Sequence, residues 1–248
     1  DLYSTANVFT TIANAYDLSA DRFKDIADLL FVTVKEGKAE GNELARTLGL
    51  VVNTASEAGL SFSEMSAVIS TLSRTQTTSQ AMIGFNQMLN AMIKPSKEAA
   101  ETAEQFGIEF GAAALKSKGF TAIIKDMHDK LQGNVEAINK ISGPIRAMRA
   151  VVSLTGKQYE NFIDILEKAE SQIGTGVAME AFAKQTDMAK QSLENLKVQL
   201  DKTFVGVGQD LEPITKWLNK FAEDLLKSFS NADGIGKWSI YATALMAA

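Results

Sequence analysis

The stretch Lys94-Pro95-Ser96-Lys97-Glu98-Ala99-Ala100 interrupts an otherwise helical sequence pattern. Proline lacks an amide donor and disfavours helical angles in the residue before it, so we expect one helix to end at Lys94. Because the fixed φ of proline suits the first turn of a helix, Pro95 is expected to open the next helix, which continues through Glu98 and Phe106. The stretch therefore predicts a corner between two helices.

Upstream of this corner, apolar residues recur at spacings of three and four, the period of a helix with one buried face. Gly37 and Gly59 follow two of these patterns and are expected to cap the helices. Ser61 and Glu64 have the spacing of a capping box, in which each side chain accepts from the other residue's amide. The expected helices cover about residues 2–16, 20–36, 41–58, 62–74 and 79–93.

Downstream, the pattern weakens after Gly107. We expect a short extended stretch at 108–110, and residues 112–118 are ambiguous. Helical spacing then returns at about 119–131, at Val135–Ile141, after Gly143-Pro144, and at about 157–173. Alternation typical of strands is absent, so the sequence predicts an all-α fold: a compact module of short helices followed by longer coiled-coil-like or hairpin helices.

The final third of the chain has a different pattern. From Met179 onward, apolar residues repeat at heptad-like spacings, and lysines and carboxylates are mixed between them. Such a narrow apolar seam is typical of a coiled coil or a helical hairpin. Gly206, Gly208 and Pro213 interrupt it. We predict an oligomer seam made of Leu193, Leu196, Leu200, Val207, Leu211, Ile214, Leu218, Phe221 and Leu225.

These patterns divide the chain into three domains: a compact core module at 1–175, long amphipathic helices at 176–230 with a break near 206–213, and the start of an apolar helical segment at 231–248. The last segment carries Trp238 and an apolar run, but it is shorter than the roughly 20 residues that span a bilayer. Because the chain opens without methionine and stops within that run, we expect it to be cut from a longer protein.

Composition limits the function classes. The net charge of −5 argues against a general surface for nucleic acid or anionic membranes. The chain has no cysteine, which excludes disulfides, thiolate zinc sites and cysteine nucleophiles.

Residues that could carry chemistry are few. His128 is the one histidine, and a metal site needs several convergent ligands, so we expect a satisfied or solvent-facing side chain. Gly174-Thr175-Gly176 lacks the rest of a phosphate loop and is interpreted as a linker. The carboxylate pairs Asp126 with Asp129 and Glu223-Asp224 are expected on exposed helix faces. We therefore expect no enzymatic activity and no catalytic, cofactor-binding or metal-binding residues.

Two further sets of side chains allow a binding role. Met82, Met88 and Met92 could form an adaptable partner-binding groove, although core packing is the favoured interpretation. Arg146 and Arg149 are the nearest approach to a basic cluster, and two arginines do not make a nucleic-acid site.

The order and spacing of several motifs resemble the core region of phage tail tape measure proteins. The resemblance extends over about residues 5–230, and the turn before the Ala81 helix departs from it, since this chain has Thr75–Ser79 there. Gly143–Ala147 replaces a Gly-x-x-Ala turn of that family. The matching segments are Asn42–Gly49, Thr54–Ser61, Glu64–Leu72, Ala81–Leu89, Lys94–Glu101, Phe106–Ile108, Phe120–Ile124 with Leu131, Ser192–Leu200 and Val207–Ile214.

The resemblance implies a virion structural protein that occupies the tail lumen, templates assembly and length of the tail tube, and is expelled during DNA ejection. It implies self-association as trimers or hexamers, and contacts with tail tube proteins, tail-tip or baseplate proteins and tail assembly chaperones. DNA would share the lumen without specific binding, and the protein would pass through the host cytoplasm during assembly. As one helix, the chain would reach only about 370 Å, so we expect a folded module rather than the ruler itself.

Two other function classes remain open at the level of sequence. A membrane-active protein that assists DNA passage through the cell envelope would use the C-terminal apolar segment, and continued apolar sequence downstream would favour it. An unrelated cellular helical scaffold would lack phage tail genes as neighbours.

Overall fold

The computed structural model describes residues 2–19, 22–178, 180, 181 and 184. Within these ranges the chain forms twelve α-helices and a short 3-10 helix, η2, and contains no strand, which confirms the predicted all-α class. The helices are α1 Leu2–Ala15, α2 Phe23–Gly37, α3 Gly41–Thr47, η2 Leu48–Leu50, α4 Val52–Glu57, α5 Phe62–Ser73, α6 Thr78–Ile93, α7 Lys97–Gln105, α8 Ala112–Lys118, α9 Phe120–Leu131, α10 Val135–Ser142, α11 Ile145–Thr155 and α12 Tyr159–Gln172.

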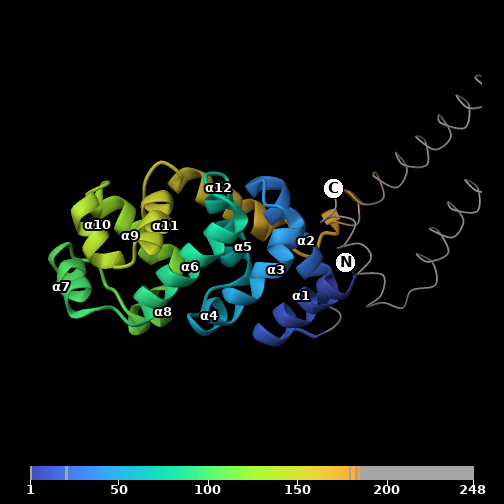
Figure 1. The fold of residues 1–248 in the computed structure, drawn as a ribbon, viewed down its shortest axis with the longest axis horizontal. Coiled ribbons are helices and arrows are strands. Elements are labelled where there is room, and N and C mark those ends of the chain that lie inside the picture. Colours follow the sequence, from blue (N-terminus) through green and yellow to red (C-terminus); the bar gives the residue numbers. More distant parts are fainter. Residues whose placement is uncertain (1, 20–21, 179, 182–183, 185–248) are drawn as a thin grey trace, which may run out of the picture.

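Helices α1–α12 form one elongated helical body (Figure 1). Helix α5 lies in its middle and packs against α2, α12 and α6. Helix α6 in turn packs extensively against α11. Helices α1 and α2 lie at one end of the body, and α7 and α10 lie at the other.

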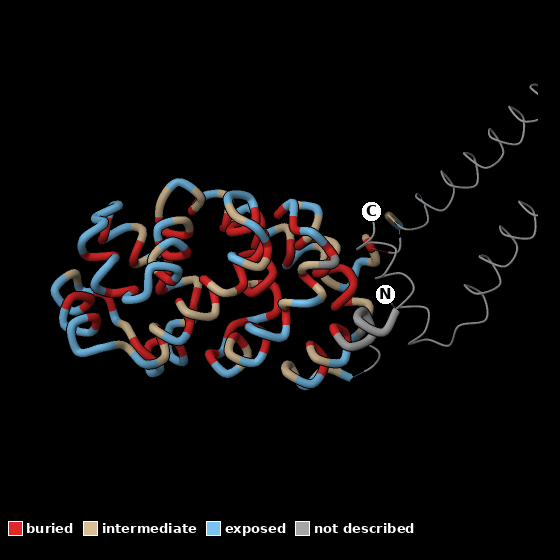
Figure 2. The backbone as a smooth tube through the Cα atoms, in the orientation of Figure 1, coloured by how far each residue is buried: buried red, intermediate tan, exposed pale blue. Residues whose placement is uncertain are grey.

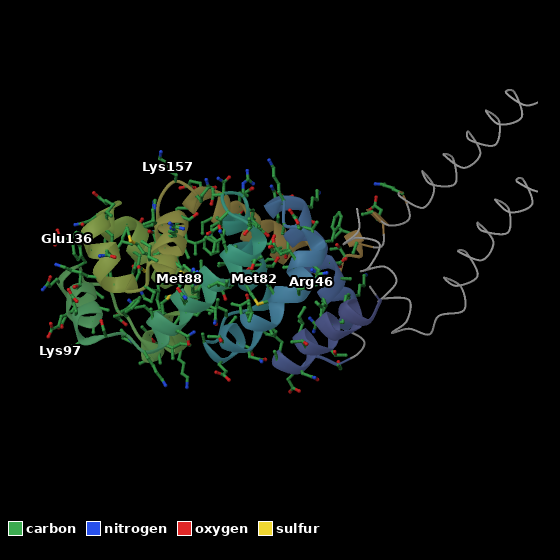
Figure 3. All side chains as sticks on the ribbon, in the orientation of Figure 1. Arg46, Met82, Met88, Lys97, Glu136 and Lys157 are labelled. Carbon is green, nitrogen blue, oxygen red and sulfur yellow. The ribbon has the colours of Figure 1, made fainter. Side chains whose placement is uncertain are left out.

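A continuous apolar core runs through the helical body, with exposed residues on the outer surfaces of its helices (Figure 2). The rings of Phe85, Phe120 and Phe162 follow one another in this core, with centroids 6.2 Å and 6.3 Å apart. Met82 and Met88 are fully buried in it (Figure 3). Together with Met92, which is also buried, they confirm the core interpretation of the methionines rather than the groove.

The corner at Pro95 exists, but its geometry differs in one respect from the expectation. Helix α6 ends at Ile93, and Lys94 leaves helical angles with φ −128° and ψ 73°, as predicted. Pro95 does not open α7. The N-cap is Ser96, whose hydroxyl accepts from the Ala99 amide at 3.1 Å. The serine hydroxyl accepts a hydrogen bond from a free amide in the first turn of α7, and the side chain of proline has no acceptor for it. This explains why Ser96 is the N-cap and α7 begins two residues after Pro95.

Gly59 ends α4 as expected, because its positive φ of 82° lets the following amide of Leu60 reach the carbonyl of Ala55 at 3.0 Å. Gly37 does not cap α2. It is the last residue of that helix, and Lys38 takes the left-handed cap conformation. A Cβ on Gly37 would lie 2.5 Å from the Cα of Ser70, so glycine is required for the close approach of α2 to α5.

One other expectation needs correction. The single helix expected at 41–58 is divided into α3, η2 and α4, because Gly49 weakens helix in the middle of the segment and the chain tightens into a 3-10 turn. Residues 108–110, where a short extended stretch is expected, lie outside the helices, and Ile108 is buried as part of the cap that ends α7. The ambiguous segment 112–118 is helix α8.

Glu64 connects three parts of the body. The predicted capping box is present, with the Ser61 amide donating to Glu64 at 2.8 Å and the Glu64 amide donating to Ser61 at 3.0 Å. The other carboxylate oxygen accepts from the amide and hydroxyl of Thr121, at 3.2 Å and 2.7 Å. Glu64 therefore caps α9 as well, where Gly119 has no side chain to do so. Burial, and to a lesser extent the charge of Glu64, raises the pKa of Tyr16.

Candidate functional site

Helices α6 and α11 approach each other closely at Gly84. A Cβ on Gly84 would lie 3.0 Å from the carbonyl oxygen of Arg146 and 3.7 Å from the Cβ of Ala150. Glycine costs a helix roughly 1 kcal/mol relative to alanine, so its presence in the middle of α6 needs a compensating contact. The backbone of α11 at Arg146 provides that contact. Gly84 thus fixes where the side chains of α11 stand relative to α6.

Beside this contact lies a small pocket with a volume of about 160 Å³. It is lined by Gln76, Gln80, Ile83, Arg146 and Arg149, and we call it the arginine pocket. The residues before and within the first turns of α6 contribute two amide groups and one aliphatic side chain, and α11 contributes two guanidinium groups. The lining is thus rich in hydrogen-bond donors.

The charge of the arginine pocket is not balanced by its own helices. Helix α6 contains no ionisable side chain, and Arg146 and Arg149 are the charged residues of α11. Both arginines are exposed, and neither forms an ion pair within the part of the chain that the structure describes. Guanidinium groups bind carboxylates and phosphates with paired hydrogen bonds. The pocket is therefore suited to an anionic group supplied from outside.

Apolar side chains flank the two arginines on the surface of α11. Ile145 is 61% exposed and Val152 is 37% exposed, and their spacing of seven places them on one face with Arg149 between them. Val135, at the start of the neighbouring helix α10, is 57% exposed. This surface combines unpaired positive charge with accessible apolar area, a combination found at protein–protein contacts.

A second arrangement lies at the other end of the body, where residues 174–176 follow α12. Asp28 on α2 is fully buried and accepts from the amides of Gly176 at 2.8 Å and Ala178 at 3.0 Å. These amides belong to the start of the helical segment at residues 177–178, so Asp28 acts as its N-terminal cap from a distant helix. Gly174 and Gly176, with φ of 72° and 89°, make the turn that presents the amides. The predicted linker is thus a turn with a defined anchor.

His128 has structural contacts, as expected. Its Nδ1 lies 2.8 Å from the carbonyl oxygen of Thr155, and its ring stacks on Tyr159 with centroids 3.9 Å apart and planes 8° apart. Burial raises the pKa of Tyr159. These contacts connect α9 to α11 and α12, and no group of three or more metal-ligand side chains gathers among the described residues.

The paired carboxylates lie at the surface with lysine partners. Asp126 lies 3.5 Å from both Lys118 and Lys130, and Asp129 pairs with Lys125. This confirms the exposed-face interpretation for Asp129, whereas Asp126 is half-buried between its two lysines. Glu223 and Asp224 lie outside the residues that the structure describes.

Comparison with protein families matches residues 1–143 to the phage-related minor tail proteins. The match extends over more than half of the 248 residues. The chain belongs to this family. Comparisons with curated proteins and with solved structures gave no significant match.

This phage-related minor tail protein is therefore a component of a phage tail. The matched region ends after α10, so it contains the α6 side of the arginine pocket and Asp28, while Arg146 and Arg149 follow directly behind it. Membership in this family leaves the hypothesis of an unrelated cellular scaffold without support.

The predicted oligomer seam of this minor tail protein, from Leu193 to Leu225, lies outside the described residues, as does the apolar segment at 231–248. Both stay predictions. None of the helices in the described ranges has the length and apolar character needed to cross a membrane. Sequence reasoning named Arg146 and Arg149 but did not place them beside Gln76 and Gln80, and it did not single out Asp28.

Proposed function

We propose that this minor tail protein is part of a tape measure protein, in which residues 1–178 form a folded module next to the part that sets tail length. The observation that carries this proposal is the family match over residues 1–143, on the same helices whose motifs resemble the tape measure core region. A phage tail protein whose helical motifs recur in that order is best explained as a tape measure.

The helical body supports the role of a module rather than a ruler. A ruler gains length from uninterrupted helix, at about 1.5 Å per residue. Helices α1–α12 are short, turn back on one another and bury a common core, so they add little length along any axis. Asp28 holds the start of the following segment against the body, which gives that segment a defined point of departure.

In this proposal the protein lies in the tail lumen, templates tube assembly and leaves ahead of the DNA during ejection. It associates with its own copies and contacts tube proteins, tail-tip or baseplate proteins and assembly chaperones. Its role is structural and not enzymatic. DNA passes through the same lumen without a specific site.

The test is tail length in particles that carry in-frame deletions in the parent protein. Deletions in helical sequence beyond residue 178 are expected to shorten the tail by about 1.5 Å for each residue removed, measured by electron microscopy. An equally long deletion within 97–142 is expected to prevent tail assembly. Tails of unchanged length after the first deletion would refute the tape measure assignment, and proportionally shorter tails after the second would refute the module.

The membrane-active alternative rests on the sequence from Trp238 to Met246, which lies outside the described residues. No feature of the helical body favours it, so it stays a secondary prediction.

A further inference from the structure

We propose that the arginine pocket binds glutamate side chains of α7 from a second copy of this chain. This contact would join the helical bodies of neighbouring copies. It is separate from the predicted seam between Leu193 and Leu225, and it does not depend on the tape measure assignment.

The basic side of the contact is the surface formed by α6 and α11. Arg146 and Arg149 are spaced by three residues and are exposed beside a pocket, with no carboxylate on either helix to neutralise them. The chain has a net charge of −5, so most of its surface charge is negative. Two neighbouring arginines without a carboxylate partner are therefore unusual on it. The uncompensated charge therefore selects for an acidic partner surface.

The acidic side is α7, where Glu98, Glu101 and Glu104 are all exposed and follow one another at spacings of three. Glu136, and to the smallest extent the charge of Glu98, raises the pKa of Lys140 on α10. Glu98 thus already interacts weakly with a cation of its own chain, and we assign the contact to Glu101 and Glu104. Glu101 forms one ion pair, with Lys97 at 3.6 Å, in which both side chains are more than half exposed. Such an exposed pair is weak and is readily exchanged for a stronger one.

The two surfaces match in spacing. Residues three apart on a helix are separated by about 4.5 Å along its axis, so the backbone positions of Glu101 and Glu104 have the same axial interval as those of Arg146 and Arg149. The exposed methyl group of Ala100 beside Glu101 allows the backbone of α7 to approach the apolar side chains next to the pocket, Ile83 and Ile145.

The geometry requires a second copy. Helix α7 packs mainly against α10 at one end of the body, and the arginine pocket lies between α6 and α11 (Figure 1). Because the contact uses two different surfaces of the same chain, it is head-to-tail, and its repetition closes a ring or extends a filament.

The test is a charge exchange in the full chain. The double variants R146E/R149E and E101R/E104R should each weaken self-association at least about tenfold, measured by sedimentation, because like charges then face each other. In an equimolar mixture of the two variants, every contact between unlike variants again joins opposite charges, so mixed pairs and assemblies in which the two variants alternate should form with the affinity of the parent contact. Circular dichroism checks that both variants are folded.

The matched control is E167R/E170R on α12, which makes the same charge change at the same spacing on exposed positions and should leave association unchanged. Because the chain has no cysteine, copies carrying Gln105→Cys and Gln80→Cys should form a disulfide with each other on oxidation. A monomeric parent chain, variants that associate like the parent, or a mixture without recovery would each overturn the proposal.

Discussion

Gly37 determines how closely α2 and α5 pack at the centre of the helical body. A Cβ at this position would lie 2.5 Å from the Cα of Ser70 and 2.8 Å from its carbonyl oxygen. Both atoms belong to the backbone, so they cannot move away as the end of a flexible side chain can. The close approach also brings Thr33 within 2.7 Å of Ser66, which gives these buried hydroxyls partners.

We therefore expect Gly37→Ala to destabilise the protein, even though alanine is the better helix former by about 1 kcal/mol. Forcing α5 away from α2 should cost more than this gain, for a net loss of about 2 kcal/mol in the free energy of unfolding, measured by chemical denaturation. Gly49→Ala is the control, because no atom lies within 4 Å of the added Cβ. Equal stability of the two variants would contradict the argument.

At the scale of elements, Glu64 makes the N-termini of α5 and α9 depend on one side chain. One carboxylate oxygen completes the capping box with Ser61, and the other accepts from the amide and hydroxyl of Thr121. Two helices that are far apart in the sequence are thus aligned by a single carboxylate, which a local capping motif alone would not achieve.

Glu64→Ala should accordingly cost more than the loss of one cap. We expect a decrease of about 2–3 kcal/mol in the free energy of unfolding, since amides at the ends of both helices lose their acceptor. Ser61→Ala, which affects α5 only, should cost about 1 kcal/mol. Thermal or denaturant unfolding of the two variants measures the difference, and equal losses would show that the contact with Thr121 adds nothing.

These elements also show what the sequence can predict. Helical period, the capping box at Ser61 and the break at Lys94 depend on neighbours along the chain, and all three were predicted correctly. Gly37 was assigned to a cap because its true constraint, Ser70, lies on another helix. The same reason applies to the arginine pocket: Arg146 and Arg149 were identified, but their position beside Gln80 depends on the packing of α6 against α11. No local signal marks Asp28.

At the scale of the whole molecule, Asp28 joins the end of the helical body to its beginning. Its carboxylate, on α2, holds the amides of Gly176 and Ala178, which follow α12. Asp28 and Ala178 are fully buried and Gly176 is half-buried, so water has little access to the Ala178 amide when the carboxylate is removed.

Asp28→Ala should therefore release the segment after α12. We expect a loss of about 3 kcal/mol in the free energy of unfolding and faster hydrogen exchange at the amides of Gly176 and Ala178. Asp28→Asn, which keeps one oxygen acceptor, should lose less. The control is Asp164→Ala, which removes an exposed carboxylate paired with Lys168 and should change little. Unchanged exchange at both amides in Asp28→Ala would exclude the anchor.

The Asp28 contact also determines how the helical body responds to force. Helix α1 packs on α2, α3 and α4, and residues 176–178 are bonded to α2, so the first helix and the segment after the last helix both lie at the same end of the body. If the chain is pulled at α1 and at residues 176–178, the force acts first on the contacts that these two segments make with α2. Helices α7 and α10, at the far end of the body, carry no force at that stage. Under such a pull the body opens by peeling from its base, one contact after another, and not by sliding of whole helices past each other.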